Sequence, residues 1–226
     1  MPTRLLSTNG TSSGSRRSAG AALLLALASA VCTPNTRVED YPTTIAAARR
    51  EKDRSFRESS DSPVPIEKRR ELLPLRYFAI DAAYRVPATL RLARDPEIVE
   101  MATSTGLRRQ MRIIGTLEFN IKGTPLTLTA LSDEGDAQGR RLFIPFADLT
   151  SGTETYAAGR YLDLDRLPSG VYDLDFNRAY HPYCYYDSKF DCPYPPRSNR
   201  LPIPIRAGER LPVFTGSAVG AVGVRP

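Results

Sequence analysis

The sequence contains one histidine and three cysteines among its 226 residues, so it has few of the side chains that metal and nucleophile chemistry require. A zinc site takes about four nitrogen, sulfur or carboxylate ligands. Cys184 and Cys192 are eight residues apart with only His181 beside them, which is not a metal-binding spacing. A serine hydrolase would have to use His181 as its base, and no G-x-S-x-G elbow lies after residue 31. We therefore expect no metal site, no cofactor and no serine-hydrolase chemistry.

The sequence also lacks an apolar run of transmembrane length near its N-terminus. A polar, positively charged stretch ends at Arg17. The apolar stretch that follows, from Ala19 to Val31, has about 13 residues, fewer than the roughly 20 of a spanning helix. This is the pattern of a secretory signal. Cleavage after Ala30 would give a soluble exported protein, and lipidation of Cys32 would give a lipoprotein, although the residues before Cys32 make a poor lipobox. An uncleaved anchor is the third alternative.

We therefore expect a protein exported to the periplasm or cell envelope. Its contact with the membrane would be made only through the signal sequence or a lipid on Cys32. The formal net charge of +6 includes Arg4, Arg16 and Arg17, and falls to about +3 once the leader is removed. No basic stripe with interleaved aromatic residues is visible, so nucleic acid is not an expected partner.

Composition favours β structure. The chain has 19 prolines and 15 glycines, which indicate many turns, with an ordinary 41% of hydrophobic and 25% of charged residues. We predict one mainly β domain, an antiparallel barrel-like or sandwich arrangement of roughly eight strands with one or two short N-terminal helices. The predicted segments are a signal peptide at 1–31, a tether and short helix at 32–61, the β domain at 62–210 and a C-terminal tail at 211–226.

Two helices are predicted before the strands. Residues 43–58 read as a solvated helix that packs mainly through Ile45 and Phe56. A shorter helix begins at Pro65 and ends before Pro74.

Alternating apolar and polar residues then predict the strands. The clearest is a hairpin in which 111–121 and 126–130 flank a turn at 122–124. Pro87 suggests that the strand at 83–92 is an edge strand or carries a bulge. Further strands are predicted at 97–103, 142–146 and 203–206, and a second hairpin at 161–176.

The second hairpin would place four aspartates on one face of two neighbouring strands: Asp163, Asp165, Asp173 and Asp175. Like charges on adjacent strands repel unless they are compensated. Nearby arginines or water would suffice, and a divalent cation is the sharper alternative.

The stretch from Asp175 to Leu201 is too irregular for a long helix or strand and holds Cys184 and Cys192. Cysteines of an exported protein tend to pair, so we predict a disulfide between these two, which would stabilise the fold by roughly 2 to 3 kcal/mol. Cys32 would then remain unpaired, which favours its lipidation.

Three strings carry a family resemblance: PVPIEKRRELLPLRYFAIDAAYRV, FADLTSGTETYAAGRYL, and DFNRAYHPYC with DCPYPPRSNRLPIPIRAGER. The sequence resembles the bacterial domain-of-unknown-function family 1684 from about Arg49 to Glu209. The family pattern F-x-D-x-T-x-G-x-x-T-Y-x-x-G-R is filled here from Phe146 to Arg160. His181 stands where the family tends to have Asn, which argues against a family-wide catalytic histidine. The resemblance implies a mainly β domain and no established activity.

The polar residues of these motifs suggest a pocket for a small polar or anionic ligand, because guanidinium groups bind carboxylates and phosphates bidentately. The candidate ligand-binding residues are Asp148, Thr150, Tyr156, Arg160, Asn177, Arg178, Tyr180, Asn199 and Arg200. The competing interpretation is that these groups hold the protein's own loops. We expect an exported ligand-binding or structural module, or alternatively a hydrolase-like enzyme that uses Asp148 and neighbouring carboxylates. Convergence on an open cleft would favour the enzyme, and consumption of the polar atoms by the backbone would favour the structural role.

Overall fold

The computed structural model describes residues 40–136 and 138–212. The predictions for the signal peptide and Cys32, and for nearly all of the C-terminal tail, lie outside these residues. In the described part of the chain, no helix is long and apolar enough to cross a membrane.

The first helix, α1 (Tyr41–Glu58), begins where the carboxylate of Asp40 accepts a hydrogen bond from the backbone N–H of Thr43 at 2.9 Å. Its buried residues are Ile45 and Phe56, which confirms the predicted packing face. A single 3₁₀ turn leads into the four-residue helix α2 (Arg69–Leu72).

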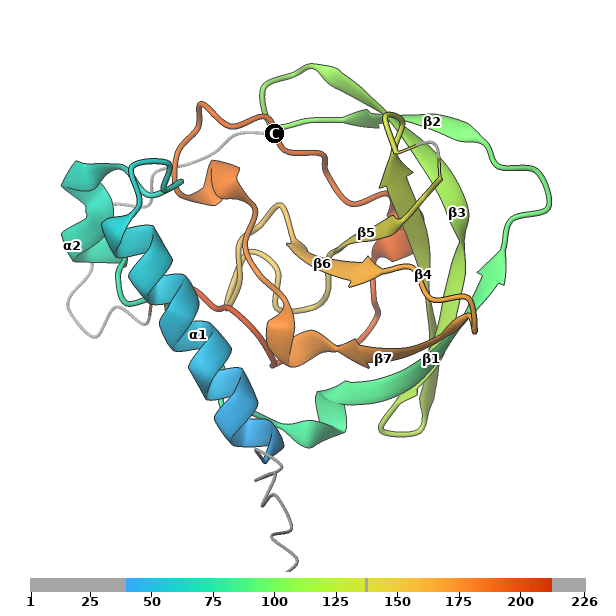
Figure 1. The fold of residues 1–226 in the computed structure, drawn as a ribbon, viewed down its shortest axis with the longest axis horizontal. Coiled ribbons are helices and arrows are strands. Elements are labelled where there is room, and N and C mark those ends of the chain that lie inside the picture. Colours follow the sequence, from blue (N-terminus) through green and yellow to red (C-terminus); the bar gives the residue numbers. More distant parts are fainter. Residues whose placement is uncertain (1–39, 137, 213–226) are drawn as a thin grey trace, which may run out of the picture. The chain divides into compact units, whose positions relative to one another are not determined.

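Seven antiparallel strands follow, and they form one strongly curled sheet (Figure 1). The strands are β1 (Arg85–Leu92), β2 (Ile98–Ala102), β3 (Arg108–Ile121), β4 (Thr124–Asp133), β5 (Arg141–Phe146), β6 (Arg160–Asp165) and β7 (Val171–Asp175). Their order is β6-β5-β4-β3-β1-β7, with β2 paired to β3. The mainly β, barrel-like prediction is confirmed, with seven strands in place of eight.

The core of the domain fills the concave side of this sheet. Alternate residues of the strands supply it, including Leu117 and Leu128, which are fully buried and directly opposite each other on β3 and β4. The β3–β4 hairpin was predicted correctly. Its two-residue turn needs positive φ at both positions, and Lys122 (51°) and Gly123 (86°) provide it.

A β-bulge in β3 decides which surface each half of that strand faces. Ile113 is opposite Leu131 and Gly115 is opposite Ala130, so β3 has one extra residue, Ile114, at this point. Beyond the bulge the odd-numbered residues Leu117, Phe119 and Ile121 enter the core, and Ile114 does so at the bulge itself, whereas Met111 and Ile113 before it belong to a separate cluster. The bulge therefore turns Arg109 and Met111 to the convex side of the sheet. A Cβ added at Gly115 would collide with the carbonyl oxygen of Arg91.

The edge position predicted for the strand with Pro87 is wrong, because β1 lies between β3 and β7. The β1–β3 pairing begins at Ala88, one residue after the proline. A missing backbone N–H is tolerated at that end of the ladder.

The second predicted hairpin is also wrong. β6 pairs with β5, and β7 pairs with β1, so the two arms form opposite ends of the strand order. The alternation of apolar residues was read correctly, since Leu162 and Leu174 are both buried in the core. Alternation identifies the buried face of a strand but not its partner.

Residues 203–206 do not form the predicted strand. Ile205 is fully buried, as expected from its apolar character, but its carbonyl oxygen accepts a hydrogen bond from the Arg160 guanidinium at 2.7 Å. A side chain has thus replaced the neighbouring strand as the hydrogen-bond partner.

Candidate functional site

The predicted site residues of the signature loop, Phe146–Arg160, hold the backbone of the protein itself. Arg160 has no exposed surface and donates to the Asp148 carboxylate at 2.8 Å. It also donates to the carbonyl oxygens of Ile205, Ala207 and Glu209. Burial lowers the pKa of Arg160, and the Asp148 charge opposes that shift. The guanidinium acts as a clamp on a segment that has no strand partner there.

The other polar atoms of the signature loop are paired internally in the same way. Asp148 accepts hydrogen bonds from the backbone N–H groups of Thr150 at 2.6 Å and Ile205 at 3.3 Å. The hydroxyls of Thr150 and Thr155 bond each other at 3.0 Å and are fully buried. No carboxylate of this loop is left free to act on a substrate, so the geometry favours the structural interpretation over the hydrolase-like one.

The two asparagines are likewise engaged by backbone groups. Asn177 donates to the carbonyl oxygen of Asp81 and accepts from its N–H, at 2.8 and 3.0 Å. The Asn199 side chain accepts a hydrogen bond from the backbone N–H of Thr129 and donates to its carbonyl oxygen. It also donates to the carbonyl oxygen of Pro145. Each amide therefore ties a C-terminal loop to a strand or turn far away in sequence.

The remaining predicted site residues do not converge on one site. Arg178 is exposed and lies 3.4 Å from the Asp175 carboxylate. Tyr180 donates its hydroxyl to Asp163 at 2.6 Å, and Arg200 is exposed. Tyr156 is the last of these residues, and its ring lies 6.4 Å from that of His181, measured between ring centroids.

The four aspartates that were predicted to cluster are dispersed, because β6 and β7 do not pair. Asp163 binds Tyr180, and Asp173 forms an ion pair with Arg85 at 2.5 Å. Asp175 is buried and accepts from the backbone N–H of Asn177. The described residues contain no group of three or more His, Cys, Asp or Glu side chains that could hold a metal ion.

His181 is buried in a polar cluster with Glu209. Its Nε2 accepts from the backbone N–H of Tyr156 at 3.3 Å. Burial lowers the pKa of His181 to about 4, so the ring is neutral at pH 7. Glu209 receives bonds from Lys52 Nζ (2.6 Å), the His181 N–H (2.7 Å) and the Tyr186 hydroxyl (2.9 Å). Burial alone would raise the pKa of Glu209, but Lys52 and the His181 N–H hold it below its usual value.

The predicted disulfide is corrected by the structure, in which Cys184 and Cys192 are free, buried thiols. They are in contact, since the backbone N–H of Cys184 donates to Cys192 Sγ at 3.2 Å. A hydrogen bond from the Cys192 thiol lowers the pKa of Cys184 to about 7. The two cysteines, eight residues apart, lie next to each other as expected, but they are not covalently linked.

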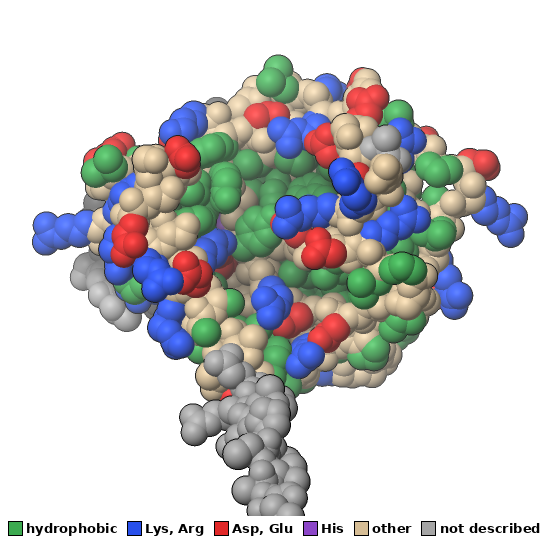
Figure 2. Space-filling model, in the orientation of Figure 1, with side chains coloured by type: hydrophobic (Ala, Val, Ile, Leu, Met, Phe, Trp, Pro, Cys, Tyr) green, Lys and Arg blue, Asp and Glu red, His purple; other side chains and the backbone are tan. Residues whose placement is uncertain are grey.

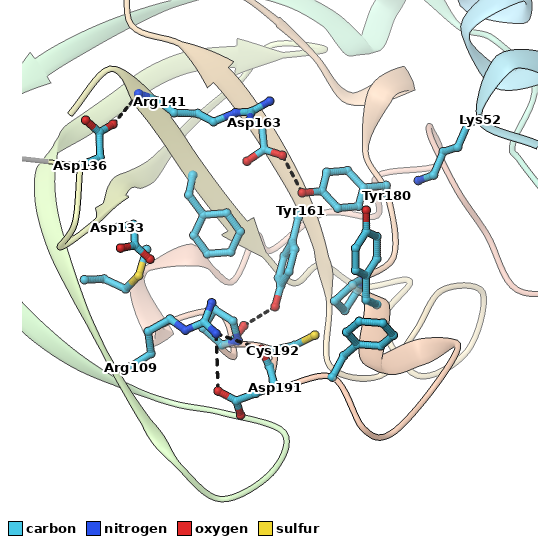
Figure 3. Close-up of a pocket in the computed structure, with 16 residues that line it drawn as sticks. Lys52, Arg109, Asp133, Asp136, Arg141, Tyr161, Asp163, Tyr180, Asp191 and Cys192 are labelled. Carbon is cyan, nitrogen blue, oxygen red and sulfur yellow. Dashed lines mark hydrogen bonds and ion pairs between the residues drawn. The ribbon is translucent and has the colours of Figure 1, made fainter. Parts of the chain in front are cut away.

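A different part of the molecule holds an open cavity of about 720 Å³, which we call the sheet cavity. It lies between the faces of β3, β5 and β6 that are opposite to the core and the loop of residues 180–193 (Figure 3). Figure 2 shows hydrophobic side chains in a hollow of this face, with basic and acidic side chains around it. Sixteen residues line the cavity, and seven of them lie on β3, β4, β5 and β6.

The floor of the sheet cavity is aromatic. Phe143 and Tyr161 pack edge to face at 4.7 Å between ring centroids, and Tyr161 meets Tyr180 at 5.8 Å. Tyr183 and Phe190 form a second edge-to-face pair at 5.3 Å. Such surfaces bind flat apolar groups well.

The charged groups at the rim of the sheet cavity differ in how they are paired. Each of the four carboxylates accepts a hydrogen bond from the protein; their donors are the Gly135 N–H to Asp133, the Arg141 N–H to Asp136, the Tyr180 hydroxyl to Asp163 and the Thr105 hydroxyl to Asp191. Arg109 lies 3.6 Å from Asp191. The Arg141 guanidinium has neither a hydrogen bond nor an ion pair with any other residue that the structure describes, and in Figure 3 its side chain extends along the rim toward Asp163. Among the charged groups at the rim, the one with unused hydrogen-bond donors is therefore a cation, Arg141.

Comparison with known proteins identifies the family. The model of the family described as "Protein of unknown function (DUF1684)" matches residues 71–210. The chain belongs to the DUF1684 family. A solution NMR structure of an uncharacterized protein from Haloarcula marismortui is 41% identical to this DUF1684 protein, with a TM-score of 0.61, and the match covers 76% of this chain and 95% of that one. No curated protein matches.

The family match confirms the resemblance in the sequence. In the structure, conspicuous motif residues of this DUF1684 domain, such as Arg160 and Asn199, hold its own backbone. Of the residues that line the sheet cavity, Tyr180 alone was among the candidate ligand-binding residues, and Asp163 and Cys192 were predicted for other roles. A signal for the other lining residues existed in Phe143 and Met111, which are large apolar residues at strand positions opposite to the core pattern.

Proposed function

We propose that this DUF1684 protein is a binding module for a small amphipathic anion, with the sheet cavity as its site. The flat apolar part of the ligand would lie on Phe143 and Tyr161, and its carboxylate, sulfonate or phosphate would pair with Arg141. The observation that carries the proposal is the guanidinium of Arg141, which has no hydrogen-bond or ion-pair partner among the described residues and lines the same cavity as the aromatic floor. The neighbouring Asp163 carboxylate already accepts a hydrogen bond from Tyr180. An arginine in that position presents a fork of donors to an oxyanion.

A fluorescent aromatic sulfonate, 1-anilinonaphthalene-8-sulfonate, has the required chemistry and tests the proposal directly. We expect one saturable site on the folded protein and at least about tenfold weaker binding to Arg141→Met, because a hydrogen bond to a charged group contributes roughly 1.5–3 kcal/mol. Fluorescence titration measures the dissociation constant.

The matched control is Arg108→Met, which removes the same charge from an exposed β3 residue that does not line the cavity. Its affinity should stay within about twofold of the parent protein, since it loses only a remote charge. Equal affinities of the two variants, or binding only when near-ultraviolet circular dichroism shows lost tertiary packing, would refute the proposed site.

We further propose that the protein is exported, on the strength of the charged and apolar pattern up to Val31. Intact mass spectrometry of the protein from its native membrane and soluble fractions tests this. An N-terminus at Val31 indicates soluble export, and a diacylglyceryl group on Cys32 indicates a lipoprotein. A species that retains Met1 in the soluble fraction would contradict both routes.

A further inference from the structure

Lys52 is a second cation of the sheet cavity, and it comes from α1 rather than from the sheet. Its side chain is 25% exposed, and its ammonium nitrogen lies 4.8 Å from the centre of the Tyr180 ring. An ammonium group has three hydrogen-bond donors. The Glu209 carboxylate accepts one of them at 2.6 Å, and no other described residue accepts a hydrogen bond from Lys52. The remaining donors are therefore free for a ligand in the cavity.

Lys52 and Arg141 reach the aromatic floor from different elements and lie apart along its rim. In Figure 3 the order along the rim is Arg141, Asp163, Tyr180 and Lys52. The Tyr180 hydroxyl donates to Asp163 at 2.6 Å, so these two side chains form a continuous stretch between the two cations. The Tyr161 ring lies beside Tyr180 at 5.8 Å between centroids. A flat ligand that lies on these rings can therefore meet a cation at each of its two ends.

The two cations differ in how their charge is compensated. Lys52 is paired with Glu209, which is buried and also accepts from the His181 backbone N–H and the Tyr186 hydroxyl. Burial opposes the charge of Glu209, but Lys52 and the His181 N–H hold its pKa below the usual value, so the carboxylate is ionised at pH 7. This charge repels a second anion beside Lys52. The Lys52 end therefore suits an uncharged acceptor, whereas Arg141, which has no ion pair among the described residues, suits the anionic group.

We propose that Lys52 selects ligands of the sheet cavity that carry an uncharged hydrogen-bond acceptor, such as a ketone or amide carbonyl, on the side of the ring system away from the anionic group. The inference rests on the proposed binding of an amphipathic anion at Arg141, and it narrows the ligand to an aromatic oxo or amido acid. The carbonyl oxygen accepts from Lys52 Nζ beside the Tyr180 ring, while the anionic group pairs with Arg141. A ligand of the same shape without the acceptor covers the Lys52 donors with apolar atoms and loses affinity.

Displacement of 1-anilinonaphthalene-8-sulfonate from the full-length protein by three related naphthoates tests the proposal. The first is 6-acetyl-2-naphthoate, and the second is 6-isopropenyl-2-naphthoate, which has the same planar outline with a CH₂ group in place of the carbonyl oxygen. We expect the parent protein to bind the acetyl compound about tenfold more tightly than the isopropenyl compound. The third, naphthalene-2,6-dicarboxylate, places a second anion at the same position and should bind no more tightly than the acetyl compound, because Glu209 repels it.

Variants of the Lys52–Glu209 pair show whether Lys52 is the source of the preference. Lys52→Met alone leaves Glu209 buried without its counter-charge, so the double variant Lys52→Met/Glu209→Gln removes both charges together. It should bind the acetyl and isopropenyl compounds within about twofold of each other. Glu209→Gln alone leaves the charge of Lys52 uncompensated, and should make the dicarboxylate the tightest of the three ligands by about tenfold. Arg50→Met is the matched control, because Arg50 is exposed on α1 and does not line the sheet cavity, and it should keep the tenfold preference of the parent protein.

Equal affinities of the acetyl and isopropenyl compounds in the parent protein would overturn the inference, and so would a preference that persists in the double variant. Tighter binding of the dicarboxylate than of the acetyl compound to the parent protein would also overturn it, since the Lys52 end would then take an anion. These results leave the proposed function intact as long as binding of 1-anilinonaphthalene-8-sulfonate depends on Arg141. Absence of that dependence would refute the site and the inference together.

Discussion

Replacement of Arg160 by methionine is expected to lower the free energy of unfolding by about 3–5 kcal/mol. The substitution leaves the Asp148 carboxylate buried without its counter-charge. It also removes the donor to the carbonyl oxygens of Ile205 and Glu209. Because the chain contains no tryptophan, circular dichroism in a urea titration is the appropriate measurement.

Arg166→Met provides the comparison, since Arg166 is exposed and its side chain, among the described residues, bonds only the carbonyl of Gln138. Its effect should stay within about 0.5 kcal/mol. Arg160→Lys keeps the charge but not the planar fork, and should lose about 1–3 kcal/mol. A loss below about 1 kcal/mol in Arg160→Met would contradict the role of this side chain as the clamp of the loop.

The second large effect concerns acid stability and His181. The pKa of His181 is lowered to about 4 in the folded protein, against 6.5 for an ordinary histidine. Between these values the unfolded chain binds a proton that the folded one does not, so acidification favours unfolding. The slope is up to about 1.4 kcal/mol per pH unit, and the total loss from about pH 6.5 to about pH 4 is up to about 3 kcal/mol. The stabilisation is fully present above about pH 6.5.

His181→Asn removes this titration and keeps a side-chain oxygen that can accept from the Tyr156 N–H. We expect its stability to be nearly flat between about pH 7 and about pH 5, where that of the parent protein falls. Below that range both proteins lose stability, because the lowered pKa of Glu209 stabilises the fold only above the point at which its carboxylate protonates. Parallel urea titrations across pH decide the question, and identical slopes for the two proteins would rule out His181 as the source.

Local patterns made much of the fold predictable. The β3–β4 hairpin follows from alternation on both sides of a short turn, and α1 follows from its few apolar positions. The partners of β6 and β7 were not predictable in this way, because the same alternation suits any neighbour that covers the apolar face. The strand expected at 203–206 failed for a related reason, since its hydrogen-bond partner is the side chain of Arg160.

The candidate sites illustrate a different limit. Chemically rich residues such as Asp148 and Asn199 stand out in the sequence, yet their polar atoms are used by the protein's own backbone. The rim of the sheet cavity depends on Arg141, an unremarkable residue at the start of a strand. Its importance comes from the loop that covers the convex side of the sheet and from the charges around it, neither of which a single segment reveals.

The extra residue in β3 divides the odd-numbered positions of that strand into two groups that face different surfaces and can be substituted independently. Before Ile114, the residues at 109 and 111 face the sheet cavity, and after it Leu117 and Phe119 face the core. One strand can therefore diversify its ligand-facing half while its core-facing half stays constant. If β3 kept Ile114 but ran without the bulge, the inward and outward positions of its first half would exchange, so recognition in this domain depends on the bulge as much as on the side chains of β3.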